Sequence, residues 1–480
     1  MIKSLSTEFG ADVAHASRGK AVAIGIAASA FAVLPVFVIA HPVLVLPLTI
    51  IPMALLFIFR IPIWLCLGFV AFSFFRLHEA FPFLMPLHIP QLLALPTLLV
   101  LVWHIGVKKQ VQPYWGPGLT AFAAFFVIVT LGIPFASNVG MALGYWTATY
   151  SKIGIMTIAI AWLVRKDGDF SLALRVIVLS GAAVALVAIS NKLAGIGLVE
   201  GTRVTIGRDF GSVLGDPNDL SLVLTFPLSF AVSLATSRQR WFITLLGFAA
   251  TGIIVWAVLC TQSRGGLIGT MAVFAVTGLR VVKSKLVLGG IGGTAAAILF
   301  AVAGISDRSS GGASESGIDE SAMGRIWAWT AAWNMAVDKP LHGVGLDNFI
   351  PNFWLYTPHW TGFNKAVHST WLGVLAETGF PGIIAFVTMV IVNVVVAYKA
   401  SRMLRASNAP VSVTALSYAV LAGFAGFCGS GTFLTQGFTW PVYILIALTS
   451  AVSQYAKTFA QSEAQDAKSP KPAKKIQQIQ

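Results

Sequence analysis

Long apolar runs dominate this chain and leave few folds open to it. A transmembrane helix needs about 20 apolar residues in succession, and runs that meet or approach this length recur from residue 21 to residue 456. They cover residues 21–40, 43–59, 61–75, 90–107, 117–135, 147–164, 172–190, 219–236, 241–261, 265–279, 285–304, 372–398, 411–428 and 437–456. The pattern predicts an all-α polytopic membrane protein with about 12–14 transmembrane helices.

Composition supports this class. Hydrophobic residues make up 56% of the 480 residues and charged residues only 10%, with a mean hydropathy of +0.81. A soluble globule carries roughly a quarter charged residues. The net charge of +14 does not indicate nucleic-acid binding, because the basic residues fall between apolar runs and not along one polar face.

The distribution of basic residues predicts the orientation. Positive charges collect in cytoplasmic loops, and a cytoplasmic N-terminus assigns most of the 32 lysines and arginines to that side. Both termini are then cytoplasmic. The predicted order is a cytoplasmic leader over 1–20, transmembrane helices over 21–304, a long periplasmic loop with short helices over 305–371, further transmembrane helices over 372–456 and a disordered cytoplasmic tail over 457–480. One charge, Lys152, lies within a predicted span.

An outward arginine, Arg264, occupies the turn between two runs, within Ser263-Arg264-Gly265-Gly266. Glycines permit close backbone approach or a positive φ, and a helix that begins here presents free N–H groups. An arginine beside a helix N-terminus suits an anion, phosphate above all. The alternative is an arginine that snorkels and caps a helix hairpin.

A second cluster lies in the outward loop 191–218, where Arg203, Arg208 and Asp209 precede the sequence Gly215-Asp216-Pro217-Asn218-Asp219. Asp-Pro-Asn-Asp predicts a turn and a helix N-cap, made by Asp216 or Asn218. That role does not account for Arg208, which is a second candidate anion ligand.

The long loop has a flexible and an ordered part. Residues 305–322 are rich in Ser, Gly and acids, which is typical of flexible segments. Ile326, Trp329, Trp333 and Ala336 recur at helical spacing, which predicts a helix at the membrane surface. Its tryptophans are expected to be interfacial anchors, with sugar stacking as the alternative.

His368 stands at the outward end of the run 372–398, shortly before a Gly-Phe-Pro-Gly break. A histidine there can act as a general base, or it is a surface histidine at an interface. Glu377 can orient the imidazole or cap a helix. His342 and His359 are weaker candidates in the same loop.

In their order, these motifs resemble the O-antigen ligase and O-antigen polymerase family of membrane glycosyltransferases. The matching residues are Ser263-Arg264-Gly265-Gly266, Arg325 with Trp327, Pro340-Leu341-His342-Gly343-Val344-Gly345 with Phe349, and His368 with Glu377, Gly379 and Gly382. The segment Gly211–Asn218 fits the family's glycine-to-proline-asparagine stretch, so the resemblance covers about residues 200–400. The family often has asparagine after the histidine, where this chain has Ser369.

The resemblance implies transfer of a glycan from undecaprenyl diphosphate to an acceptor hydroxyl, at the periplasmic face of a bacterial inner membrane. The acceptor would be a glycan or lipid A core, as in a ligase or a surface-polysaccharide polymerase. Preorganised arginines suit a diphosphate leaving group. The expected site is therefore His368 as proton acceptor and Arg264 as catalytic cation, with substrate-binding roles for Arg203, Arg208, Arg325 and Glu377.

No cofactor is expected, because the outward Asp and His residues lack metal-ligand spacing and no nucleotide-binding motif occurs. This favours a reaction that is independent of metal and nucleotide.

Two other classes remain open. A transporter or lipid flippase would place ionisable residues and broken helices at the bilayer midplane, whereas only Lys152 is charged within a span. A structural scaffold would leave the outward arginines without a purpose. Convergence of Arg208, Arg264, Arg325 and His368 on one outward cavity open to the lipid would favour the transferase, and scattered positions would favour transport or scaffolding.

Overall fold

The computed structural model describes residues 62–237, 239–302 and 320–468. The predicted leader, the runs 21–40 and 43–59 and most of the segment 305–322 lie outside the described residues. Within them the chain is helical, and the one pairing of strand type is an isolated bridge between Val199 and Arg203. The all-α class is confirmed.

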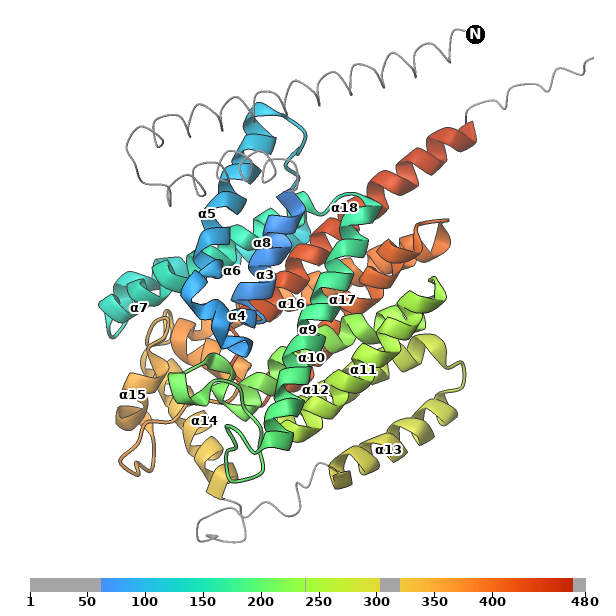
Figure 1. The fold of residues 1–480 in the computed structure, drawn as a ribbon. Coiled ribbons are helices and arrows are strands. Elements are labelled where there is room, and N and C mark those ends of the chain that lie inside the picture. Colours follow the sequence, from blue (N-terminus) through green and yellow to red (C-terminus); the bar gives the residue numbers. More distant parts are fainter. Residues whose placement is uncertain (1–61, 238, 303–319, 469–480) are drawn as a thin grey trace, which may run out of the picture.

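The elements run in chain order (Figure 1). They are α3 (Pro62–Ser73), α4 (Leu77–Ala80), η2 (Pro82–Leu87), α5 (Ile89–Val102), η3 (Trp103–Val107), α6 (Pro117–Gly132), η4 (Ile133–Phe135), α7 (Val139–Tyr145), η5 (Trp146–Tyr150), α8 (Ser151–Leu163), α9 (Asp167–Ala194), η6 (Arg208–Phe210), η7 (Val213–Gly215), α10 (Pro217–Thr236), α11 (Trp241–Thr261), α12 (Arg264–Val281), α13 (Lys285–Val302), α14 (Glu320–Asp338), α15 (Phe349–Tyr356), α16 (Thr370–Ala406), α17 (Val411–Gly431) and α18 (Trp440–Lys468).

Every predicted run from 61–75 onward contains helix within its described residues. Among the described helices, 7 are long and apolar enough to cross a membrane: Ile89–Val107, Pro117–Phe135, α9, α10, α11, α16 and α17. The protein is therefore a multi-pass membrane protein, as the apolar runs predict.

Helix α10 lies at the centre of the bundle. It contacts α9, α11, α12 and α17. In its most apolar stretch of 18 residues, 89% is buried inside the protein. Close packing depends on glycine, because a Cβ on Gly247 of α11 would lie 2.4 Å from the backbone nitrogen of Ala235. Glycine inside a helix costs roughly 0.5–1 kcal/mol relative to alanine, and close contact between the helices offsets this cost.

The predicted disordered tail is wrong in its first part, because α18 continues to Lys468. Residues 457–468 contain alanine, glutamine, lysine and glutamate, which have high helix propensity. They extend a helix that is already nucleated, so each added residue gains a hydrogen bond without a new nucleation cost. Residues 469–480 lie outside the described part of the chain.

The ordered part of the long loop has a small core of its own. Apolar side chains of α14, α15 and the start of α16 form it: Ala328, Ala331, Ala332, Met335, Val344, Phe349, Phe353, Val367 and Ala376. The predicted helix is present as α14. Ile326 and Trp333 of the predicted apolar stripe are exposed, at 43% and 52%, while the small alanines of α14 face this core and let the helix lie close to α16.

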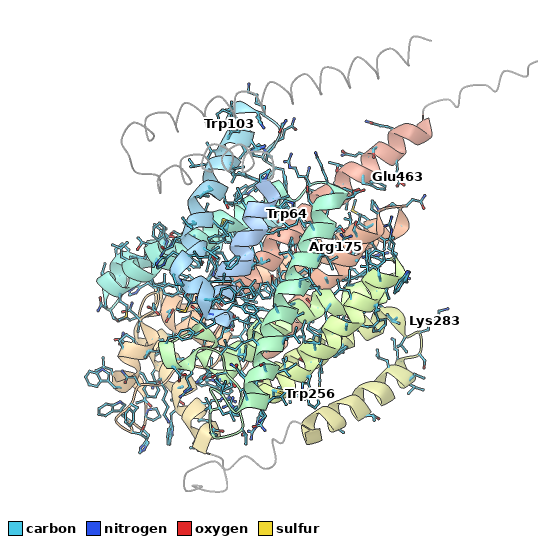
Figure 2. The ribbon with its side chains drawn as sticks, viewed as in Figure 1. Trp64, Trp103, Arg175, Trp256, Lys283 and Glu463 are labelled. Carbon is cyan, nitrogen blue, oxygen red and sulfur yellow. The ribbon has the colours of Figure 1, made fainter. Side chains whose placement is uncertain are left out.

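The two ends of the bundle differ. Helices α14 and α15 and the loop between α9 and α10 gather at one end (Figure 1), which corresponds to the predicted outward side. Lys283 and Glu463, both in segments predicted to be cytoplasmic, lie on the opposite side of the molecule (Figure 2).

Helix α16 is broken at Gly379, whose φ of 68° and ψ of −169° are not helical. The break leaves carbonyl groups of α16 without helical partners, and the turn 340–345 supplies donors for them. Val344 N donates to Ala376 O at 2.8 Å and Gly345 N donates to Glu377 O at 3.1 Å. The Pro/Gly-rich turn is thus bound to the break, which satisfies backbone groups that would otherwise be buried unpaired.

Replacement of Gly343 by alanine tests this contact. Gly343 has a φ of +63°, and an added Cβ would lie 2.3 Å from Ala376 O. Gly343→Ala is therefore expected to destabilise the protein by about 2–4 kcal/mol, from the left-handed backbone plus the steric clash. The measurement is the apparent unfolding temperature in detergent. Gly201→Ala is the control, because Gly201 has a φ of +71° with open space around it. Equal losses in the two variants would contradict the proposed packing.

Candidate functional site

Arg264 is the first residue of α12. Helix α11 ends at Thr261, Gln262 adopts a left-handed conformation with φ 50°, and Ser263 caps α12 by accepting from Gly266 N at 3.3 Å. The predicted tight turn and helix start are present. Gly266 permits close approach, since a Cβ there would lie 1.5 Å from the Ser221 hydroxyl of α10.

Arg203 connects the α9–α10 loop to this turn. Its side chain is buried, with 5% exposure. Its Nε donates to Thr261 O at 3.2 Å and its Nη2 donates to Asn218 Oδ1 at 3.0 Å. Ser263 Oγ donates to the same Asn218 oxygen at 3.0 Å. Asn218 therefore bridges Arg203 and the residue next to Arg264, and holds two outward segments together.

Asp216 is the N-cap of α10. Its carboxylate accepts from Asn218 N at 2.7 Å and from Asp219 N at 3.3 Å, and Pro217 occupies the first helical position. The predicted turn and cap are confirmed.

Arg208 is exposed and donates from Nη1 to Gly215 O at 3.2 Å. A Cβ on Gly215 would lie 3.0 Å from Arg208 Cα. Glycine at 215 therefore allows the loop to fold tightly enough for Arg208 to lie at its rim.

His368 has a left-handed backbone with φ 47°, an uncommon conformation for a residue other than glycine. Both neighbours are held. Trp329 Nε1 donates to Val367 O at 3.1 Å, and Ser369 caps α16 by accepting from Leu372 N at 3.5 Å. Serine and asparagine are about equally good N-caps, so Ser369 preserves this capping role where the family often has asparagine.

Charged groups from three segments lie close enough to His368 to shift the pKa of its imidazole. Burial lowers its pKa below 6.5, Arg325 and Arg203 lower the pKa further, and Asp216 raises it. The net lowering favours the neutral imidazole, the form that can accept a proton.

Glu377 has another role than orientation of His368. Its carboxylate accepts from Asp347 N at 3.0 Å and from Phe349 N at 3.2 Å. Among the described hydrogen bonds, none joins it to His368. Glu377 was predicted either to orient the imidazole of His368 or to cap a helix. Its contacts support capping, and the helix that it caps is α15, not α16 to which it belongs.

The remaining histidines of the loop lie against aromatic rings. His342 stacks on Phe135 with ring centroids 5.4 Å apart, and His359 lies 4.6 Å from Trp327. In the described part of the chain, no group of three or more His, Cys, Asp or Glu residues could hold a metal ion.

The structure thus brings Arg203, Arg325 and Asp216 within electrostatic range of His368, and Asn218 and Ser263 connect Arg203 to Arg264. Arg208 donates to the backbone of Gly215, the residue before Asp216. Glu377 bonds to the start of α15 and not to His368. The sequence motifs did not identify Asp216 as a charge facing His368 or Asn218 as a bridge. The available signal was that Asp-Pro-Asn-Asp holds more polar side chains than one helix cap needs.

Residues 248–387 match the family model described as O-antigen ligase. The match confirms the resemblance and spans Arg264, Arg325, His368 and Glu377, while Arg203, Arg208 and Asp216 precede it. No curated protein matches the chain.

Proposed function

From the premise that residues 248–387 carry an O-antigen ligase segment, we propose that this O-antigen ligase-type membrane glycosyltransferase takes its glycan from undecaprenyl diphosphate. The acceptor is a hydroxyl group of another glycan or of lipid A core, at the periplasmic face of the inner membrane. The observation that supports this best is the half-buried His368, whose pKa burial, Arg325 and Arg203 lower. Asn218 bridges Arg203 and Ser263, the residue next to Arg264.

The chemistry follows from these groups. The acceptor oxygen attacks the anomeric carbon of the glycan while the bond from that carbon to the diphosphate oxygen breaks. His368 accepts the proton of the attacking hydroxyl. Negative charge grows on the departing diphosphate, and Arg264 and Arg325 stabilise it as preorganised cations. This reaction needs neither metal nor nucleotide.

The six expected site residues then divide by role. His368 and Arg264 act on the reacting groups, and Arg325 binds the diphosphate. Arg203 positions Arg264, because its guanidinium is buried and hydrogen-bonded to Thr261 and Asn218. Arg208 contacts substrate from the loop rim, and Glu377 supports the site by fixing α15.

A transfer assay with purified protein tests the proposal. The protein is incubated with glycan-linked undecaprenyl diphosphate and lipid A core, with chelator present and nucleotide absent. The expected products are glycosylated acceptor and undecaprenyl diphosphate in equal amounts. A flippase would instead move the intact lipid-linked glycan across a vesicle membrane, and that result without bond cleavage would overturn the proposal.

The pH dependence of transfer provides a further prediction. The rate should fall as His368 becomes protonated. Because the pKa of His368 is lowered from 6.5, the midpoint of this decline should lie below pH 6.5. Arg325→Gln removes a cation that lowers this pKa, so the decline should begin at higher pH. Asp216→Asn removes an anion that raises the pKa, so the decline should move to lower pH. The measurement is kcat/KM for the acceptor from about pH 5 to about pH 8, a range that spans the ordinary pKa of histidine. Unmoved profiles in both variants would exclude His368 as the titrating base.

A further inference from the structure

A second cationic pocket lies at the predicted outward end, apart from His368. It has a volume of about 310 Å³ and lies between α3, η2, α5, η5 and α8, with Trp440 of α18. Its lining includes two basic residues, Arg76 and Lys152, and two histidines, His78 and His88. Glu79, behind this lining, pairs with Arg76 and lies 3.8 Å from His78, so Lys152 supplies the charge that no described ion pair offsets. The proposed transfer reaction uses none of these side chains.

Lys152 is the charge that the sequence places inside a predicted span. Its side chain is exposed and lines the pocket. A lysine within a membrane segment is costly, and such residues usually serve a binding or transport function. As a compact ammonium group, Lys152 suits phosphate as a point charge.

Arg76 is held in place beside it. Its Nε donates to Glu79 Oε2 at 2.6 Å, and its Nη2 forms a second bond to Glu79 Oε1. Glu79 also accepts from the Ser212 hydroxyl. Ser212 belongs to the loop that continues to Asp216, so the pocket is hydrogen-bonded to the segment that carries part of the His368 surroundings.

The surroundings of the pocket are apolar. Element η2 lines it through Met85, and α5 lines it through Pro90 and Ala94. These two elements expose Phe83 at 75%, Leu87 at 54% and Leu92 at 65%. Apolar side chains exposed in a membrane protein face lipid. The pocket therefore suits a ligand that combines an anionic group with a lipid portion.

We propose that this pocket binds a phosphate group of the lipid-borne acceptor. The inference rests on the proposed function, in which Arg264 and Arg325 hold the diphosphate of the donor. A second set of cations is then available for a second anionic lipid. The Ser212–Glu79 hydrogen bond joins the two sites, so that donor and acceptor are bound on either side of the same loop.

A binding experiment tests the pocket directly. Protein in phosphatidylcholine nanodiscs is titrated with lipid A core glycolipid, either phosphorylated or enzymatically dephosphorylated, and the Kd is measured by native mass spectrometry. Wild-type protein is expected to bind the phosphorylated form about tenfold more tightly. Lys152→Gln should bind both forms equally. Lys339→Gln is the matched control, because Lys339 is an outward lysine that donates to Ser137 Oγ, and it should behave as wild type.

Several results would overturn the proposal. They are equal binding of the two glycolipids by wild type, unchanged discrimination in Lys152→Gln, and loss of discrimination when phosphatidylglycerol is present at the same concentration. The last result would assign the pocket to bulk anionic lipid.

The transfer assay separates this inference from the proposed function. Lys152→Gln is expected to raise the KM for phosphorylated acceptor about tenfold, with kcat and the donor KM unchanged. A raised donor KM would place the pocket in the donor site and overturn the inference. His368→Ala should retain wild-type discrimination in binding. If it does so while no protein transfers glycan, the proposed function fails and the phosphate pocket stands.

Discussion

His368→Ala is expected to lower kcat for glycan transfer by about 10²–10⁴-fold, the usual contribution of a positioned general base. The variant should still insert and fold, because the backbone around His368 is held by Trp329 and Ser369 and not by the imidazole. The measurement is single-turnover transfer with saturating lipid-linked glycan, so that binding does not limit the rate.

His359→Ala is the matched control, since His359 belongs to the same loop and its ring lies against Trp327. We expect a change of less than about threefold, as for a surface substitution that removes no reacting group. Transfer at the wild-type rate by His368→Ala would remove the proposed base from the mechanism.

Arg264→Ala is expected to reduce kcat by about 10²–10³-fold, as for loss of one preorganised group that stabilises charge in the transition state. Arg264→Lys retains the charge but loses the planar fork of donors, and should recover no more than about a tenth of the wild-type rate. The assay is release of undecaprenyl diphosphate, which reports directly on the leaving group.

Arg175→Ala serves as the control for loss of an arginine. Arg175 is exposed on α9, is labelled in Figure 2, and belongs to the predicted cytoplasmic side. It should have no effect on the rate. If Arg264→Ala were as active as Arg175→Ala, Arg264 would be a helix-capping residue only, the alternative that the sequence leaves open.

The helices could be predicted well because a helix that spans a membrane must be long and apolar, and both properties can be recognised in a continuous stretch of sequence. Helix α14 was predicted from periodicity, but its buried face was not, since Trp333 is exposed while the small Ala331 is buried. Periodicity identifies an apolar stripe, whereas close approach to α16 selects the smallest side chains. The same limit applies to residues 457–468, where polar composition did not reveal continuation of α18.

The site was predictable to the extent that motifs mark positions. Arg325 and His368 were identified as candidates, and the structure brings them within electrostatic range of each other. Their relation to Asp216 could not be read from sequence, because it depends on how the α9–α10 loop folds over α10. Glu377 shows that closeness in sequence does not establish contact. It lies nine residues after His368, yet its carboxylate accepts from the backbone N–H groups of Asp347 and Phe349 at the start of α15.

The break at Gly379 also constrains biogenesis. The turn 340–345 donates its N–H groups to carbonyls of α16, a helix that leaves the ribosome later than the turn itself. Until α16 has been synthesised, the nascent outward segment therefore lacks the acceptors to which it docks. The order of synthesis thus makes completion of the His368 environment a late event, which follows insertion of a span encoded downstream of it.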